Sequence, residues 1–124
     1  MSNLLSVVII AKNEEQFIQD AIKSAQFADE VLLLDSGSID KTCEIAKKLG
    51  ARVENQVWLG FGPQKNSAID LAINDWVFVL DSDERISPKL QKFSFCNTKA
   101  SFEVLNQYFK HIIGISYLMH ILNR

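Results

Sequence analysis

The sequence has few of the features that mark nucleic-acid-binding, secreted and metal–thiolate proteins. No basic run is longer than Lys47 and Lys48, and the formal net charge is -2, so there is no electrostatic footprint for nucleic acid. The two cysteines, Cys43 and Cys96, have neither metal-ligand nor redox spacing. The chain opens without the basic segment and apolar run of a signal peptide, and we therefore expect a cytoplasmic protein.

Charge divides the chain into two parts. Residues 1–91 contain 9 Lys or Arg and 14 Asp or Glu, whereas residues 92–124 contain 4 and 1. A length of 124 residues with 48% hydrophobic content suits one domain with its own core. We therefore expect a domain over residues 1–91 and an atypical tail over 92–124.

Short apolar runs rich in β-branched residues predict the strands of a sheet. Continuous apolar runs suit strands that are buried on both faces, as in parallel sheets. Three such runs and one shorter, more polar run predict strands at residues 4–10, 31–35, 76–81 and 51–55.

Helical patterns lie between the predicted strands. Asn13 can N-cap a first helix whose third residue is Gln16, and a second helix from about 40 to 49 ends at Gly50. A third is predicted at about 63–73. The alternating order predicts an α/β fold, a Rossmann-like parallel sheet with right-handed crossovers and helices on both faces.

Acidic residues follow the predicted strands, where parallel sheets bind their ligands. Asp81 and Asp83 are two apart in extended chain, so both carboxylates can share a divalent cation, although Asp81 can instead cap a turn. Asp35 can accept hydrogen bonds from a ribose hydroxyl or a base N–H, or it can belong to a helix-capping turn.

Two further stretches are open to both a structural and a functional interpretation. The residues "KNEE", which include Asn13 and Glu14, suit a plain helix cap followed by acids at a helix N-terminus. In "GPQKNSAID", Lys65 lies early in a predicted helix, where it can hold a phosphate or remain an ordinary exposed lysine.

Four stretches taken together are more specific than any one of them. In order and spacing, "VVIIAKNEE", "VLLLDSGSIDKT", "GFGPQKNSAI" and "DWVFVLDSDE" resemble the nucleotide-sugar-binding half of inverting family 2 glycosyltransferases with the GT-A fold. The likeness is greatest to bacterial lipopolysaccharide and lipooligosaccharide core glucosyltransferases and covers about residues 4–90. It implies transfer of a sugar, glucose in that group, from a UDP-sugar to a lipopolysaccharide core acceptor.

The resemblance also implies roles for individual residues. A Mg²⁺ or Mn²⁺ ion held by Asp83, with Asp81 beside it and near the ribose, would neutralise the clustered acids and the charge that builds on the departing UDP. The remaining implied nucleotide-sugar contacts are Ala11, Asn13, Glu14, Asp35 and Lys65.

The likeness fades after "ISPKL", and the tail contains a single acid, Glu103. No catalytic base can be assigned, so a nucleotide-sugar-binding module that lacks the acceptor half is the alternative function. The tail has three interpretations: a helix covering the sheet, an amphipathic helix in peripheral contact with the membrane, or the product of a truncated or frameshifted gene. An uncovered sheet would also favour self-association.

Two other enzyme classes fit the sequence less well. A phosphoaspartyl hydrolase places its Asp-x-Asp after the first core strand, whereas Asp81 and Asp83 follow the fourth predicted strand. The absence of Gly-x-Gly-x-x-Gly after the first strand disfavours a dinucleotide-binding protein.

Overall fold

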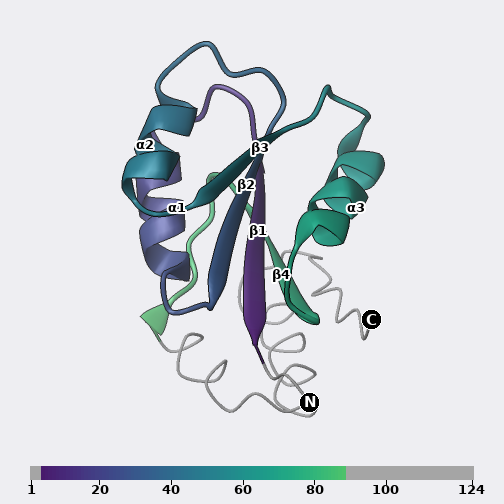
Figure 1. Cartoon of the computed structure of the whole chain (residues 1–124). Coiled ribbons are helices and arrows are strands. Elements are labelled where there is room, and N and C mark those ends of the chain that lie inside the picture. The colour runs from purple at the N-terminus through teal and green to yellow at the C-terminus, as the bar shows by residue number, and fades with distance from the viewer. Residues whose placement is uncertain (1–3, 89–124) are drawn as a thin grey trace.

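The computed structural model describes residues 4–88, which form a single parallel sheet with helices on both faces (Figure 1). The elements in chain order are β1 (Leu5–Ala11), α1 (Ile18–Ala25), β2 (Glu30–Asp35), α2 (Thr42–Lys48), β3 (Arg52–Asn55), α3 (Phe61–Leu71) and β4 (Trp76–Asp81). This is the predicted α/β, Rossmann-like architecture.

The strand order of the sheet is β3-β2-β1-β4, with every pair parallel. Strand β1 lies between β2 and β4, and its register pairs Ala11 with Asp35 and Ile10 with Asp81. Because paired parallel strands end together, this register brings the polar segments that follow β1, β2 and β4 to one edge of the sheet.

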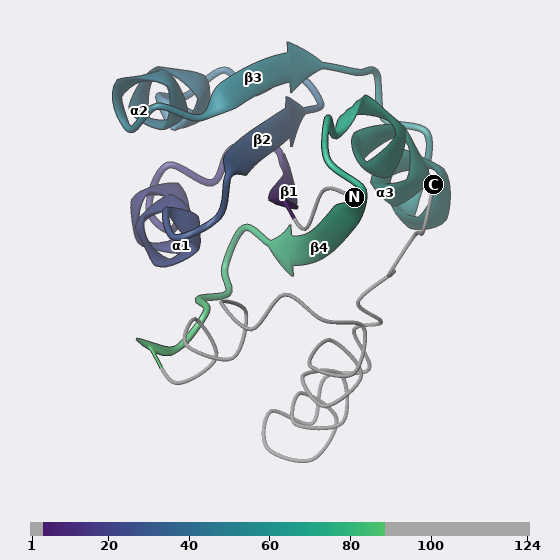
Figure 2. The same ribbon diagram turned by 60° about the horizontal axis from the view of Figure 1, so that its bottom comes forward.

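Both faces of the sheet are covered, which explains why β1 is buried throughout and apolar at every position except Ser6. Val7 and Ile9 pack in the core beneath α1 and α2, whereas Val8 and Ile10 pack beneath α3 (Figure 2). Each large aliphatic side chain buried in this way stabilises the fold by about 1.5–3 kcal/mol. The apolar face predicted for the first helix is also confirmed, since Ile18, Ala21, Ile22 and Ala25 are all buried.

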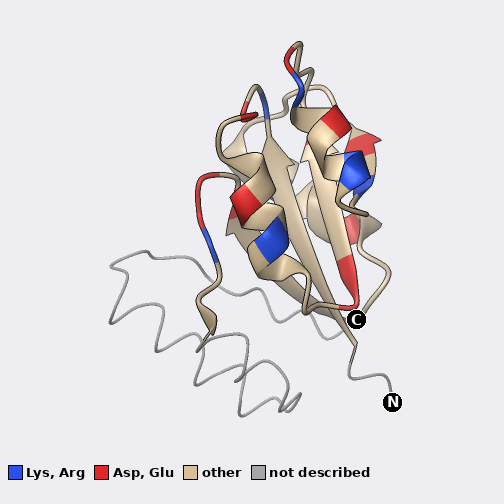
Figure 3. Cartoon of the chain, turned by 90° about the vertical axis from the view of Figure 1, so that its left-hand side faces the viewer, with Lys and Arg blue, Asp and Glu red and all other residues tan. Residues whose placement is uncertain are grey.

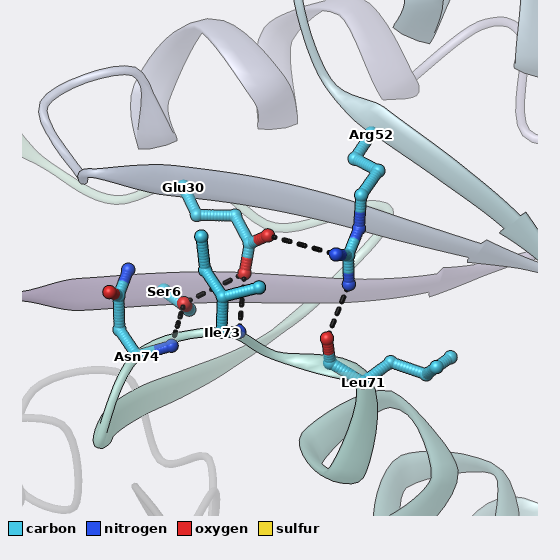
Figure 4. A network of polar contacts seen from close by, with 6 residues as sticks. All are labelled: Ser6, Glu30, Arg52, Leu71, Ile73 and Asn74. Carbon is cyan, nitrogen blue, oxygen red and sulfur yellow. Dashed lines mark hydrogen bonds and ion pairs between the residues drawn. The ribbon is translucent and has the colours of Figure 1, made fainter.

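A polar network fixes the opposite, amino-terminal edge of the sheet (Figure 4). The Glu30 carboxylate accepts hydrogen bonds from Ser6 Oγ at 2.8 Å and from the Ile73 N–H at 3.1 Å. It also pairs with Arg52 Nη1 at 3.5 Å, and Arg52 in turn donates to the carbonyl of Leu71. The network ties β1, β2 and β3 to the end of α3 and so sets where α3 lies on the sheet.

The first helix begins later than the sequence predicts, because Asn13 does not cap it. Helix α1 begins at Ile18, and no side chain caps its N-terminus. Asn13 has a positive φ of 54°, and its Oδ1 accepts a hydrogen bond from the distant Ile39 N–H at 2.8 Å. A long-range partner has therefore replaced the local cap.

The other helix boundaries differ by one or two residues. Helix α2 begins at Thr42 rather than near 40, and α3 both begins and ends two residues before the predicted range 63–73. Gly50 stops α2 as predicted, with a φ of +87° and an N–H that donates to the Lys47 carbonyl at 3.1 Å.

Acidic and basic residues are interspersed over the described part of the chain, without a continuous basic stripe (Figure 3). No helix among residues 4–88 is long and apolar enough to cross a membrane. The predicted tail domain, 92–124, lies outside the described residues.

Candidate functional site

A cavity of about 510 Å³ opens at the carboxyl ends of β1 and β4. Five of the residues predicted to bind nucleotide-sugar or metal line it: Ala11, Glu14, Lys65, Asp81 and Asp83. The other lining residues are Ile10, Lys12, Ser36, Trp58, Phe61 and Ser82. The remaining two predicted site residues, Asn13 and Asp35, support the loops around the cavity without lining it.

Three carboxylates gather directly after β4. Asp81, Asp83 and Glu84 each offer an oxygen atom, and these atoms lie within 4.8 Å of one another. Such a group of hard oxygen ligands fits Mg²⁺ or Mn²⁺. Glu84 joins the two acids of the predicted pair because the chain turns here, with the Glu84 N–H donating to the Asp81 carbonyl at 3.0 Å.

Glu84 differs electrostatically from an ordinary exposed glutamate. Burial raises its pKa above the usual value, and the negative charges of Asp81 and Asp83 add to this increase. Hydrogen bonding from the Asp81 N–H to Glu84 Oε1, at 3.2 Å, acts in the opposite direction. The carboxylates therefore crowd one another, and a cation between them would relieve the repulsion.

Lys65 supplies positive charge to the same corner of the cavity. Its Nζ lies 3.8 Å from Oδ1 of Asp81, and both side chains are about a quarter exposed. Helix α3 packs on the sheet with its first turns near the carboxyl end of β4. Lys65 and Asp81, which are 16 residues apart in sequence, therefore meet here. The pair places one cationic and one anionic group where a diphosphate and its metal ion would both need partners.

Asp35 ends β2 with its side chain turned into the following loop. The carboxylate is 2% exposed and accepts hydrogen bonds from the Gly37 and Ser38 N–H groups at 3.0 and 2.8 Å, and from Ser38 Oγ at 2.5 Å. It also lies close enough to Cys43 to raise the pKa of that thiol, after burial, which is the larger cause. Asp35 therefore closes a turn within its own loop, and it does not cap α2, which begins at Thr42 without a side-chain cap.

Two hydrogen bonds join the loop after β2 to the loop after β1. Ser38 Oγ accepts a hydrogen bond from the Asn13 N–H at 2.8 Å, while Asn13 Oδ1 accepts one from the Ile39 N–H at 2.8 Å. Asp35 thus acts on the loop that carries Glu14 through Ser38 and Asn13.

Two further hydrogen bonds connect the loop after β1 to the segment at the start of α2. The Glu14 N–H donates to Thr42 Oγ1 at 2.9 Å, and the Glu15 N–H donates to Asp40 Oδ2 at 3.2 Å. A hydrogen bond from the Thr42 hydroxyl is the main cause that lowers the pKa of Asp40. Together these contacts fix Glu14 at the wall of the cavity.

The sequence-based interpretation missed the aromatic residues of the site. Trp58 and Phe61 line the cavity together, with ring centroids 4.9 Å apart and planes at 89°. Both belong to "VWLGFG", an apolar segment placed before a helix instead of inside a strand, and this placement was the available signal. Ser82, which lies between Asp81 and Asp83, was also missed.

The parallel sheet, its two helical layers and the acid-lined cavity define a Rossmann-like domain of the GT-A class. The family model described as glycosyl transferase family 2 matches residues 6–93. The chain therefore belongs to glycosyl transferase family 2.

Curated relatives carry glycosyltransferase names. The chain is 45% identical over 92 residues to an uncharacterised glycosyltransferase of Rickettsia conorii, covering 73% of this chain and 33% of the relative. It is 31% identical over 93 residues to the lipopolysaccharide core biosynthesis glycosyltransferase LpsC of Rhizobium meliloti, covering 71% and 34% respectively. The chain thus spans about a third of the length of these curated relatives.

Solved structures of glucosyl-3-phosphoglycerate synthase from Mycobacterium tuberculosis share the fold. One, in complex with Mn²⁺, UDP and phosphoglyceric acid, matches with a TM-score of 0.63 and 32% identity over 73% of this chain and 37% of that chain. Another, in complex with Mg²⁺ and UDP, has the same TM-score, identity and coverage.

Proposed function

We propose that this chain is the nucleotide-sugar-binding half of an inverting, metal-dependent glycosyltransferase. Its donor is a UDP-sugar, UDP-glucose in our assignment, and its acceptor is a lipopolysaccharide or lipooligosaccharide core. The likeness to LpsC supports the acceptor class, and the synthase complexes with UDP and metal ions support the donor.

The observation that carries the proposal is one cavity that combines an acid cluster with Lys65 at the carboxyl edge of a parallel sheet. Phosphate groups need cationic partners, and a diphosphate beside carboxylates needs a metal ion between them. The metal-bound diphosphate of a nucleotide-sugar would use both features at once.

Asp83 and Asp81 would hold Mg²⁺ or Mn²⁺, and Glu84 offers a further oxygen within 4.8 Å. When bound, such an ion supplies Lewis-acid stabilisation of the negative charge on the departing diphosphate. Lys65 contributes to the same stabilisation from helix α3. Asp81, which pairs with Lys65 at 3.8 Å, would then interact with both positive charges.

In this proposal, the hydrogen-bonded loops after β1 and β2 hold the nucleoside. Ala11 and Glu14, which line the cavity, make the direct contacts. For Asn13 and Asp35, the hydrogen bonds already made inside the loops support a positioning role in place of direct contact. Their side chains keep the wall of the cavity in place before the ligand arrives, which reduces the ordering cost of binding.

We assign no base for the acceptor hydroxyl. In an inverting displacement this hydroxyl loses its proton as it attacks, and a positioned carboxylate accelerates the step by about 10²–10⁴-fold. The carboxylates of the cluster are committed to the metal ion, and Glu14 is assigned to the nucleoside. The chain spans about a third of its curated relatives, so we place the base and the acceptor site in the part of those relatives that this chain does not match.

An alternative function follows from the same observation, namely a module that binds the nucleotide-sugar without transferring it. The test is incubation of the 124-residue chain with radiolabelled UDP-glucose, Mn²⁺ and lipopolysaccharide core acceptor. We expect UDP-glucose binding with little transfer by this chain alone, and transfer when it is extended with the remainder of a full-length relative. Failure to bind UDP-glucose would reject both functions, and transfer by the short chain would reject our placement of the base.

A further inference from the structure

The segment before α3 exposes an unusual amount of apolar surface beside the cavity. Val57 is 79% exposed, Trp58 44%, Leu59 51% and Phe61 73%. Apolar residues grouped on a surface mark a binding site more often than isolated ones do. Of these four side chains, Trp58 and Phe61 face the cavity.

The exposed segment is held in place by a buried side chain. Gln64 is 0% exposed, its Oε1 accepts a hydrogen bond from the Leu59 N–H at 3.1 Å, and its Nε2 donates to the Gln56 carbonyl at 3.2 Å. Both ends of one side-chain amide therefore bind the backbone of the loop. The Gln56 N–H also donates to the Asp35 carbonyl at 2.9 Å, which anchors the start of the loop to β2.

Backbone geometry fixes the other end of the loop. Gly60 has a φ of 105°, which side-chain-bearing residues rarely adopt, and Gln64 donates its N–H to the Gly60 carbonyl at 2.9 Å. The loop thus has exposed side chains on an anchored backbone. This combination suits a surface prepared for a ligand, because little conformational freedom is left to lose on binding.

The aromatic pair lies close to the charged corner of the cavity. Phe61 precedes Lys65 by four residues on α3, and such residues are neighbours on one helix face, about 5–6 Å apart. Lys65 in turn pairs with Asp81 at 3.8 Å. A ring attached to a diphosphate at this corner would therefore lie within reach of Trp58 and Phe61.

We propose that Trp58 and Phe61 form an aromatic wall that binds the face of a ring of the nucleotide-sugar, and that Gln64 is the residue that positions this wall. The inference rests on the proposed function. Two rings of the donor share the required chemistry: the uracil base, through stacking, and the pyranose, through its C–H face. Neither the fold nor the family match assigns a ligand to these residues.

Calorimetric titrations in Mn²⁺ test the wall, with UMP, UDP, UDP-glucose and pyrophosphate as ligands. Trp58→Ala and Phe61→Ala should each weaken UDP-glucose binding about ten-fold, since aromatic stacking contributes on this scale. Pyrophosphate, which has no ring, should bind all variants equally. Leu59→Ala is the matched control, because Leu59 is exposed in the same loop but does not line the cavity.

The pattern of losses identifies the ring. If the variants already lose affinity for UMP and UDP, the wall contacts the uracil base. If they lose affinity for UDP-glucose alone, the wall contacts the pyranose. Equal affinity of wild type, Trp58→Ala and Phe61→Ala for every ligand would overturn the aromatic wall alone. If the wild-type chain binds neither UDP nor UDP-glucose, the proposed function fails as well, so the two failures are distinguishable.

A spectroscopic readout reports on the wall directly. The chain has two tryptophans, so Trp58 becomes the sole one in a Trp76→Phe variant. We expect UDP-glucose in Mn²⁺ to change the emission of this variant, and pyrophosphate in Mn²⁺ to leave it unchanged. An emission spectrum that responds identically to both ligands would count against contact between Trp58 and a ring.

A double-mutant cycle separates positioning by Gln64 from a general loss of structure. Gln64→Met should weaken UDP-glucose binding in the wild-type background, because the loop loses both amide contacts. In a Trp58→Ala/Phe61→Ala background the same substitution should have little further effect, since no wall remains to be positioned. Equal fold-losses in the two backgrounds would show that Gln64 supports the fold only, and would overturn its assignment.

Discussion

Lys65 Nζ lies 3.8 Å from Asp81 Oδ1, so the lysine occupies one side of a carboxylate that we also assign to a metal ion. This relationship predicts opposite effects of Lys65→Met on two ligands. UDP affinity in Mn²⁺ should fall about ten-fold, because a charge-assisted contact to phosphate is lost. Affinity for Mn²⁺ alone should rise, because Asp81 no longer shares its charge with a competing cation.

Isothermal titration with Mn²⁺, in the absence and presence of UDP, measures both effects. Lys48→Met is the control, because Lys48 pairs with Glu44 on the exposed face of α2, away from the cavity. The same direction of change for Mn²⁺ and UDP in Lys65→Met would show that Lys65 and the metal ion do not share Asp81.

Asp35→Ala tests the positioning role of the buried carboxylate. The substitution leaves the Gly37 and Ser38 N–H groups without their acceptor, so we expect the free energy of unfolding to fall by about 3 kcal/mol. The nucleoside contact that the resemblance implies for Asp35 would instead give a loss of nucleoside binding with the fold intact. Urea unfolding provides the measurement, with the exposed Asp70→Ala as control. Equal stability of the two variants would reject the positioning role.

The strands were predictable because each side of the sheet is covered, which requires continuous apolar runs. Strand β4 has the predicted bounds, residues 76–81, for this reason. The pair of acids was predictable for a local reason, because Asp81 and Asp83 both come at the end of β4 and are two residues apart in sequence. Asp81 and Asp83 could therefore be placed together before any coordinates were known.

What could not be predicted depends on contacts between distant residues. The sequence around Asn13 satisfies a local capping rule, yet its side chain binds Ile39, 26 residues away. Likewise, the sequence around Gln64 is that of an ordinary exposed helical glutamine, but its side chain binds the backbone of the loop at residues 56–59. That loop also places Trp58 at the cavity. Local patterns carry no information on which distant backbone group a side chain will bind.

Gly60 and Gly62 form a matched pair for testing the anchored loop. Gly60→Ala should lower stability by about 1–2 kcal/mol, because a φ of 105° is strained for any residue with a Cβ. Gly62→Ala should raise it by about 0.5–1 kcal/mol, since Gly62 lies within α3 and has open space for a Cβ. Thermal and urea unfolding measure both, and identical shifts for the two variants would contradict the backbone geometry of the loop.

Cys43 reports on its burial beside the Asp35 carboxylate. Burial, followed by the nearby Asp35 carboxylate, raises the pKa of the Cys43 thiol, so less of it is thiolate at any pH below that value. In a Cys96→Ser chain, the alkylation rate of Cys43 should therefore reach its half-maximum at a higher pH when folded than in urea. Restricted access alone would lower the maximal rate without moving this midpoint. Coincident midpoints would contradict the arrangement of Cys43 and Asp35.

Calorimetric titration of the chain with UDP, in Mn²⁺ and in excess chelator, tests most directly whether the acid-lined cavity is a metal-dependent nucleotide site. We expect binding in Mn²⁺ and its loss in chelator, because Asp83 would otherwise face the diphosphate as an uncompensated like charge. Asp83→Asn should remove most of the affinity and the dependence on metal, whereas the exposed Asp70→Asn should leave both unchanged. Equal UDP affinity of the wild-type chain with and without chelator would contradict the proposed site.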